Sequence, residues 1–126
     1  AGGLPMRTIL VADDERALRL LVTGTLEIGN YQIIEADNGK TALCLAKKEN
    51  PDLAILDVMM PGMNGYEVCK QIKASSQTKH IKVLILTAKG QQADKEAAKK
   101  AQADFYLPKP FSPTVLLAKI NEILGD

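Results

Sequence analysis

Five polar residues stand at the ends of short apolar segments of the sequence, where their side chains could do chemistry together. They are Asp13, Asp14, Asp57, Thr87 and Lys109. If the apolar segments form parallel strands of one open sheet, these side chains meet at its C-terminal edge, where α/β sheets bind ligands. Carboxylates, a hydroxyl and an ammonium group in one place suggest a carboxylate that accepts a phosphoryl group beside a divalent cation.

The three carboxylates suit Mg²⁺, which prefers hard oxygen ligands and keeps several of its bound waters. Asp14 and Asp57 can each offer it an oxygen, and Asp13 can hold a metal-bound water. A phosphoryl group in transfer spreads negative charge over three oxygens, so positive charge and hydrogen-bond donors must surround it. Lys109 would supply such a charge, and the Thr87 hydroxyl would supply a hydrogen bond.

Each of the five residues also has a purely structural interpretation. The aspartates could cap a helix or begin a turn, because Asp is favoured at both places. Thr87 could simply end a strand, and Lys109 could be a solvated surface residue. The occurrence of all five at successive strand ends favours a shared site instead.

Apolar periodicity predicts five strands that alternate with five helices. The strands are expected at 8–12, 31–36, 53–56, 83–86 and 105–107. The helices are expected at 15–28, at 38–50, from Gly65 onward, at 91–102, and from Pro113 onward after a Ser112 cap. Compact apolar strands that alternate with amphipathic helices are typical of a parallel sheet covered on both faces. We therefore predict an α/β fold, a single flavodoxin-like doubly wound (βα)5 domain whose parallel five-stranded sheet has the strand order 2-1-3-4-5.

The first helix and the two cysteines carry expectations about burial. In the first helix four apolar residues recur at helical spacing and are expected to face the core. They are Leu18, Leu21, Val22 and Leu26. Cys44 and Cys69 match no metal-binding spacing, so they are expected to be free thiols, buried or half-buried, in a reducing compartment.

Composition restricts the partners of the chain. Its 126 residues suffice for one domain with a real core. A formal net charge of +1 gives no electrostatic case for direct binding to nucleic acid or to a membrane. No apolar run approaches the ~20 residues of a membrane span, and no secretory signal is visible. We therefore expect a cytoplasmic protein.

Four segments of the chain together resemble the receiver domain of two-component response regulators, in particular that of the chemotaxis regulators. They are residues 9–15, 51–66, 84–88 and 107–111, which read ILVADDE, PDLAILDVMMPGMNGY, LILTA and LPKPF. Their joint order and spacing make the resemblance specific. It implies a receiver domain over residues 7–126, preceded at 1–6 by a disordered leader or a cloning remnant.

The resemblance also implies a phosphoryl donor and a metal site. A sensor histidine kinase or a phosphotransfer protein would donate the phosphoryl group to Asp57. Mg²⁺ would be held by Asp14, Asp57 and the backbone carbonyl of Met59, while Asp13 assists through a water molecule. The chain would then be a regulatory phosphoacceptor and not an enzyme, with only weak self-phosphorylation and self-dephosphorylation.

A switching mechanism is implied in the same way. Residues matching Thr87 and Lys109 contact the phosphoryl oxygens, and the one matching Tyr106 rotates inward when Thr87 is drawn to them. The surface formed by the fourth helix, fifth strand and fifth helix would change and control an output domain or partner protein. A homodimer that forms on phosphorylation is compatible with this scheme. Met59 and Lys89 occupy the positions that tune the lifetime of the phosphoryl group.

Three other functions compete with this interpretation. An aspartate-based phosphatase would need a second Asp two positions after Asp57, where the chain has Met59. A flavin-binding module would need a phosphate-binding loop after the first strand, where the two acidic side chains Asp13 and Asp14 would repel phosphate. A degenerate receiver that serves only as a protein-binding scaffold would not need all five polar residues.

Overall fold

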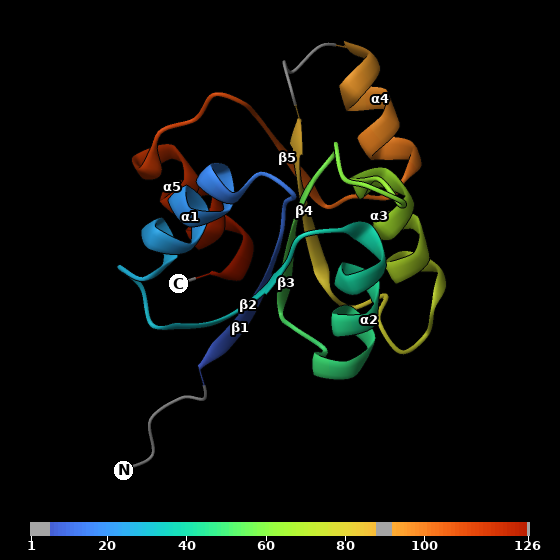
Figure 1. Ribbon diagram of the computed structural model, residues 1–126, viewed down its shortest axis with the longest axis horizontal. Helices are drawn as coiled ribbons and strands as arrows, with labels where there is room; N and C mark the ends of the chain where they lie inside the picture. The colour runs from blue at the N-terminus through green and yellow to red at the C-terminus, as the bar shows by residue number, and fades with distance from the viewer. Residues whose placement is uncertain (1–5, 88–91, 126) are drawn as a thin grey trace.

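The computed structural model describes residues 6–87 and 92–125, in which five strands alternate with five helices (Figure 1). The strands are β1 (Arg7–Ala12), β2 (Tyr31–Ala36), β3 (Leu53–Asp57), β4 (Lys82–Thr87) and β5 (Phe105–Pro108). The helices are α1 (Arg16–Leu26), α2 (Gly39–Glu49), α3 (Gly65–Ala74), α4 (Gln92–Lys100) and α5 (Pro113–Leu124). The predicted elements are all present, and their ends shift by one or two residues.

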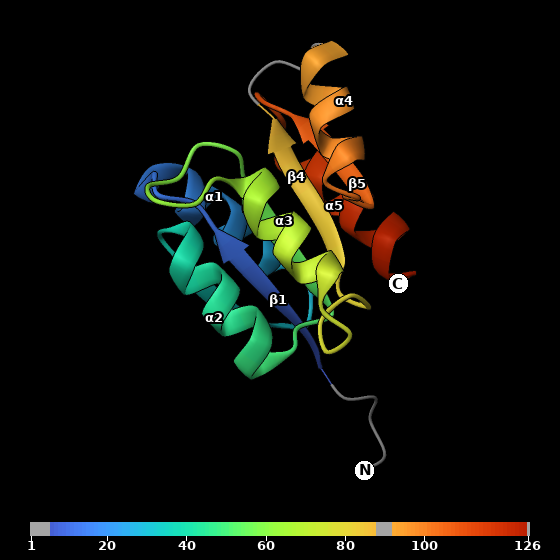
Figure 2. The same ribbon diagram turned by 90° about the vertical axis from the view of Figure 1, so that its right-hand side faces the viewer.

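The strands form one parallel sheet in the order β2-β1-β3-β4-β5, which confirms the predicted doubly wound topology. Helices α1 and α5 cover one face of this sheet, and α2, α3 and α4 lie on the other (Figure 1). The view in Figure 2 looks onto the side of α2 and α3. Because every crossover returns to a parallel strand, all strands end at the same edge of the sheet.

Strand β3 lies at the centre of the sheet and is buried along its whole length. Its side chains alternate between two apolar clusters, as the two-residue period of a strand requires. Leu53 and Ile55 join the cluster of α1 and α5, whereas Ala54 and Leu56 join that of α2 and α3. Burial on both faces explains why the strand reads as a continuous apolar run.

Two expectations about burial were wrong. The side chain of Leu21 is 42% exposed, and Thr23 and Thr25 are buried on α1 instead. Their hydroxyls donate hydrogen bonds to carbonyls of the preceding turn, which removes the penalty of burying them. Cys44 is also exposed, because α2 packs on the sheet through small residues on its opposite side, such as Ala42 and Ala46. Cys69 is buried as expected.

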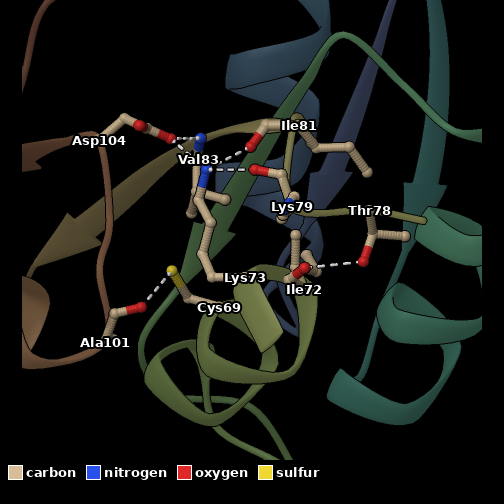
Figure 3. Close-up of polar contacts among 9 residues, drawn as sticks. All are labelled: Cys69, Ile72, Lys73, Thr78, Lys79, Ile81, Val83, Ala101 and Asp104. Atoms are coloured by element: carbon tan, nitrogen blue, oxygen red, sulfur yellow. Dashed lines mark hydrogen bonds and ion pairs between the residues drawn. The ribbon is translucent and has the colours of Figure 1, made fainter. Parts of the chain in front are cut away.

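A polar cluster around Lys73 joins α3 to the segments that precede β4 and β5 (Figure 3). Its Nζ lies 2.8 Å from Oδ2 of Asp104, and it donates to the carbonyls of Ile81 at 2.7 Å and Lys79 at 3.2 Å. The same Asp104 oxygen accepts a hydrogen bond from the backbone N–H of Val83 at 2.8 Å. Nearby, the Cys69 thiol donates to the carbonyl of Ala101. The cluster therefore ties the residues after α4 to the sheet.

The Lys73→Met variant should be less stable than the wild type by about 2 kcal/mol, because it leaves a half-buried carboxylate and two carbonyls without their cation. Urea unfolding would measure the loss. Lys70→Met is the matched control, since Lys70 is an exposed residue of the same helix. Equal losses in both variants would mean that the Lys73 contacts contribute nothing specific.

Candidate functional site

The residues expected to form the site do meet at one edge of the sheet. Asp13 directly follows β1, Asp57 is the last residue of β3, Thr87 is the last of β4, and Lys109 directly follows β5. The strands that carry them are neighbours in the order β1-β3-β4-β5. The sheet therefore brings these residues together as predicted, although they lie far apart in the sequence.

The three carboxylates form a compact cluster. One oxygen each of Asp13, Asp14 and Asp57 lies within 4.8 Å of the other two. Asp13 and Asp57 are buried, with 1% and 3% of their surfaces exposed, whereas Asp14 is exposed and opens the cluster to solvent. Oxygen ligands at this spacing, with access for water on one side, fit a hydrated divalent cation.

The ammonium group of Lys109 lies against the central carboxylate. Its Nζ is 2.7 Å from Oδ1 of Asp57, a charge-assisted hydrogen bond at the edge of the carboxylate cluster. The backbone holds Lys109 in place, because its N–H donates to the carbonyl of Thr87 at 2.7 Å. Lys109 thus places a positive charge where a group bound to Asp57 would carry negative charge.

Two buried side-chain oxygens in the part of the chain that the structure describes have no hydrogen-bond partner. They are Oδ2 of Asp13 and Oγ1 of Thr87, and both belong to this site. A buried polar atom without a partner costs roughly 1–3 kcal/mol, so such atoms are rare in folded proteins. Their presence at one edge of the sheet fits a site that is completed by an ion at Asp13 and by an oxygen-rich group at Thr87.

Burial raises the pKa of Asp13 from 3.8 to about 6. The backbone N–H of Glu15, 2.9 Å from Oδ1 of Asp13, opposes this shift, and Lys109 lowers the pKa further. The negative charges of Asp57 and Asp14 raise it, but by less than desolvation does. Repulsion from the other two carboxylates therefore raises the pKa of Asp13, but the removal of Asp13 from water raises it more.

Gly65 is a site-positioning residue that sequence reasoning did not identify. Its N–H donates to the carbonyl of Val58 at 3.0 Å, which folds the loop after Asp57 back onto α3. A Cβ atom at Gly65 would clash with the backbone carbonyl of Asp57. The available signal was the capping box that Asn64 and Glu67 form around it, which marks the start of a helix.

The remaining expected site residues have different surroundings. The side chain of Met59 is 71% exposed on the loop after β3, two residues beyond Asp57. Tyr106 on β5 is half-buried against the α2 and α3 cluster, and Lys95 Nζ lies 5.9 Å from its ring centroid. Lys89 and residues 1–5 of the expected leader lie outside the described residues.

The response regulator receiver domain model matches residues 9–121. Protein PilH of Pseudomonas aeruginosa is 37% identical over 95% of this chain and 99% of its own length. A probable transcriptional regulator, ycf27 of Porphyra purpurea, is 41% identical over 92% of the chain but only 46% of its own length. The chemotaxis response regulator CheY4 of Vibrio cholerae has a structure that matches with a TM-score of 0.89 and 34% identity, covering 94% of this chain and 99% of that one.

The chain therefore belongs to the family of response regulator receiver domains, which confirms the resemblance. This is a family of signalling domains of two-component systems and not of classical enzymes. The chain spans about half the length of several curated relatives that are transcriptional regulators. None of the helices in the described ranges is long and apolar enough to cross a bilayer.

Proposed function

We propose that this receiver domain is a phosphorylation-dependent switch that takes a phosphoryl group from a histidine kinase onto Asp57. The observation that carries the proposal is the position of the Asp57 carboxylate, 2.7 Å from Lys109 Nζ and inside a cluster of three carboxylates. No other carboxylate in the described residues combines a buried strand end with both of these neighbours.

Asp13, Asp14, Asp57 and the backbone carbonyl of Met59 would hold Mg²⁺, which supplies positive charge beside the acceptor. An oxygen of Asp57 attacks phosphorus, while the bond from phosphorus to the histidine nitrogen of the donor breaks and the imidazole leaves. Lys109 neutralises charge on the transferred oxygens, and the Thr87 hydroxyl donates a hydrogen bond to one of them.

Acetyl phosphate with Mg²⁺ should add one phosphoryl group to the protein, and the modified residue should be Asp57. Intact mass would count the groups added, and peptide mapping after borohydride trapping would locate them. The Asp57→Asn variant is the control, because it keeps the size of the side chain and removes the nucleophile. Equal labelling of that variant would exclude Asp57 as the acceptor.

Phosphorylation should change the surface formed by α4, β5 and α5, because Thr87 ends β4 and this strand pairs with β5, which carries Tyr106. A bistable element shifts only when the ligand makes different contacts with its two states. Amide NMR with and without beryllofluoride would reveal the shifts. Changes confined to the loops that carry Asp14 and Asp57 would contradict this long-range response.

The same surface would control an output domain or a partner protein, and a homodimer could form through it on phosphorylation. A protein that receives its phosphoryl group from a histidine kinase would act in the cytoplasm, and we propose that location. The phosphatase alternative is disfavoured, because Met59 stands where such an enzyme needs a second Asp. The scaffold alternative is disfavoured because the site keeps its acceptor, its cation and two unpartnered oxygens.

A further inference from the structure

Arg19 on α1 joins the loop that carries Asp13 to the neighbouring strand β2. Its Nη1 donates to the backbone carbonyl of Asp13 at 2.8 Å, and its Nε donates to Oε1 of Glu35 at 3.0 Å. The Arg19 side chain is 19% exposed and lines a polar cavity of about 360 Å³ with Glu35 and Asp37. One guanidinium group therefore ties the end of β1 to the end of β2.

This contact completes the immobilisation of Asp13. The N–H of Asp13 donates to the carbonyl of Ala36 at 3.0 Å, and its Oδ1 accepts from the N–H of Glu15 at 2.9 Å. Its carbonyl accepts from Arg19, so three of its four polar groups have protein partners. Oδ2 is buried without a partner and is the atom left to take a ligand.

The direct contact of Arg19 with Asp13 is made to the backbone carbonyl and not to the carboxylate. The exposed ion pair with Glu35 contributes little by itself, since solvent screens such pairs. The hydrogen bond to a main-chain carbonyl in the loop between β1 and α1 instead sets the position of the whole Asp13 residue.

The contacts use the planar fork of an arginine. Two nitrogens of the same guanidinium reach the carbonyl of Asp13 and Oε1 of Glu35, so the planar group fixes both contacts in one orientation. Glu35 holds the fork in the orientation that meets the carbonyl of Asp13. Arg16, in contrast, is an exposed residue at the start of the same helix.

We infer that Arg19 is a positioning residue of the metal site, which holds the β1–α1 loop so that the free oxygen of Asp13 remains available to the cation. This inference rests on the proposed Mg²⁺-dependent function. Residues that orient metal ligands typically change metal affinity by 10–100-fold when they are mutated. We expect Arg19→Ala to weaken Mg²⁺ binding by about 10-fold.

Calorimetric titration of the folded 126-residue chain with Mg²⁺ tests the inference. The proteins compared at one ionic strength are the wild type, Arg19→Ala, Arg19→Lys, Glu35→Gln and Arg16→Ala. Arg19→Lys should not restore wild-type affinity, because its flexible ammonium group lacks the planar fork that fixes both contacts in one orientation. Glu35→Gln should stay near wild type, because its amide oxygen still accepts from Nε. Arg16→Ala removes the same charge from the same helix and should change the affinity by less than about twofold, since exposed charges are screened.

Three results would overturn the inference. Wild-type affinity in folded Arg19→Ala, even with a lower melting temperature, would reduce Arg19 to a stabilising contact. Equal losses in Arg16→Ala and Arg19→Ala would assign the effect to charge. Full rescue by Arg19→Lys would remove the need for the forked contact. If the wild type binds no Mg²⁺, the proposed function itself fails. If the wild type binds Mg²⁺ and Arg19→Ala binds it with the same affinity, only the inference about Arg19 fails.

Discussion

The Lys109→Met variant should accept a phosphoryl group from acetyl phosphate roughly 100-fold more slowly than the wild type, since removal of one preorganised countercharge typically has this effect. Lys109 Nζ is 2.7 Å from Asp57 Oδ1, beside the position where the transferred oxygens gain charge. Mass spectrometry of samples quenched at successive times, at saturating Mg²⁺, would give the rate of phosphorylation.

The matched control is Lys82→Met. Lys82 is an exposed residue at the N-terminal end of β4, so it is removed from the site by the full length of the strand. Both variants lose one positive charge, and only Lys109→Met should react about 100-fold more slowly. A rate in Lys109→Met within about threefold of the wild type would mean that the Asp57–Lys109 contact has no part in transfer.

The Asp13→Asn variant should be more stable than the wild type at pH 8 in chelator, by roughly 2–3 kcal/mol. Burial raises the pKa of Asp13 from 3.8 to about 6, so its charge is unfavourable in the folded protein above that pH. Asn keeps an oxygen for the N–H of Glu15 and removes the charge. Chemical unfolding at several pH values would measure the difference.

The pH dependence of this difference follows from the sign of the shift. The folded protein holds a proton on Asp13 that the unfolded chain has released between pH 3.8 and about 6, so wild-type stability falls as pH rises through this interval. Above about pH 6 the full cost of burying the charged carboxylate is present, and below pH 3.8 this cost vanishes. The advantage of Asp13→Asn should therefore be absent near pH 4, grow to pH 6 and stay constant to pH 8.

Glu49→Gln serves as the control, because Glu49 is an exposed residue at the end of α2 and loses the same charge. The free energy of unfolding of Glu49→Gln should equal that of the wild type at each pH. Millimolar Mg²⁺ should raise the stability of the wild type more than that of Asp13→Asn, since a ligand that binds only the folded state stabilises it. An Asp13→Asn protein that is less stable than the wild type at pH 8 without metal would show that burial of this carboxylate carries no penalty.

The elements and the meeting of the candidate site residues at one edge of the sheet were predictable because both depend on local pattern and on one topological rule. Apolar runs such as Leu53–Asp57 are recognisable because a strand buried on both faces has few polar residues. Parallel strands with right-handed crossovers must end at a common edge, which brings Asp13, Asp57, Thr87 and Lys109 together from distant parts of the chain. Residue types at those ends then indicated the chemistry.

Only the tertiary structure decided how much each side chain is covered and which polar group meets which. Leu21 and Cys44 fit the patterns of their helices, yet both are exposed, because the width of the buried stripe depends on the neighbours that cover it. The pKa of Asp13 depends on the depth of its burial more than on the adjacent aspartates that the sequence displays. Long-range contacts such as Arg19 with Glu35 and Lys73 with Asp104 leave no periodic signal, because they join surfaces whose approach is set by packing of the whole domain.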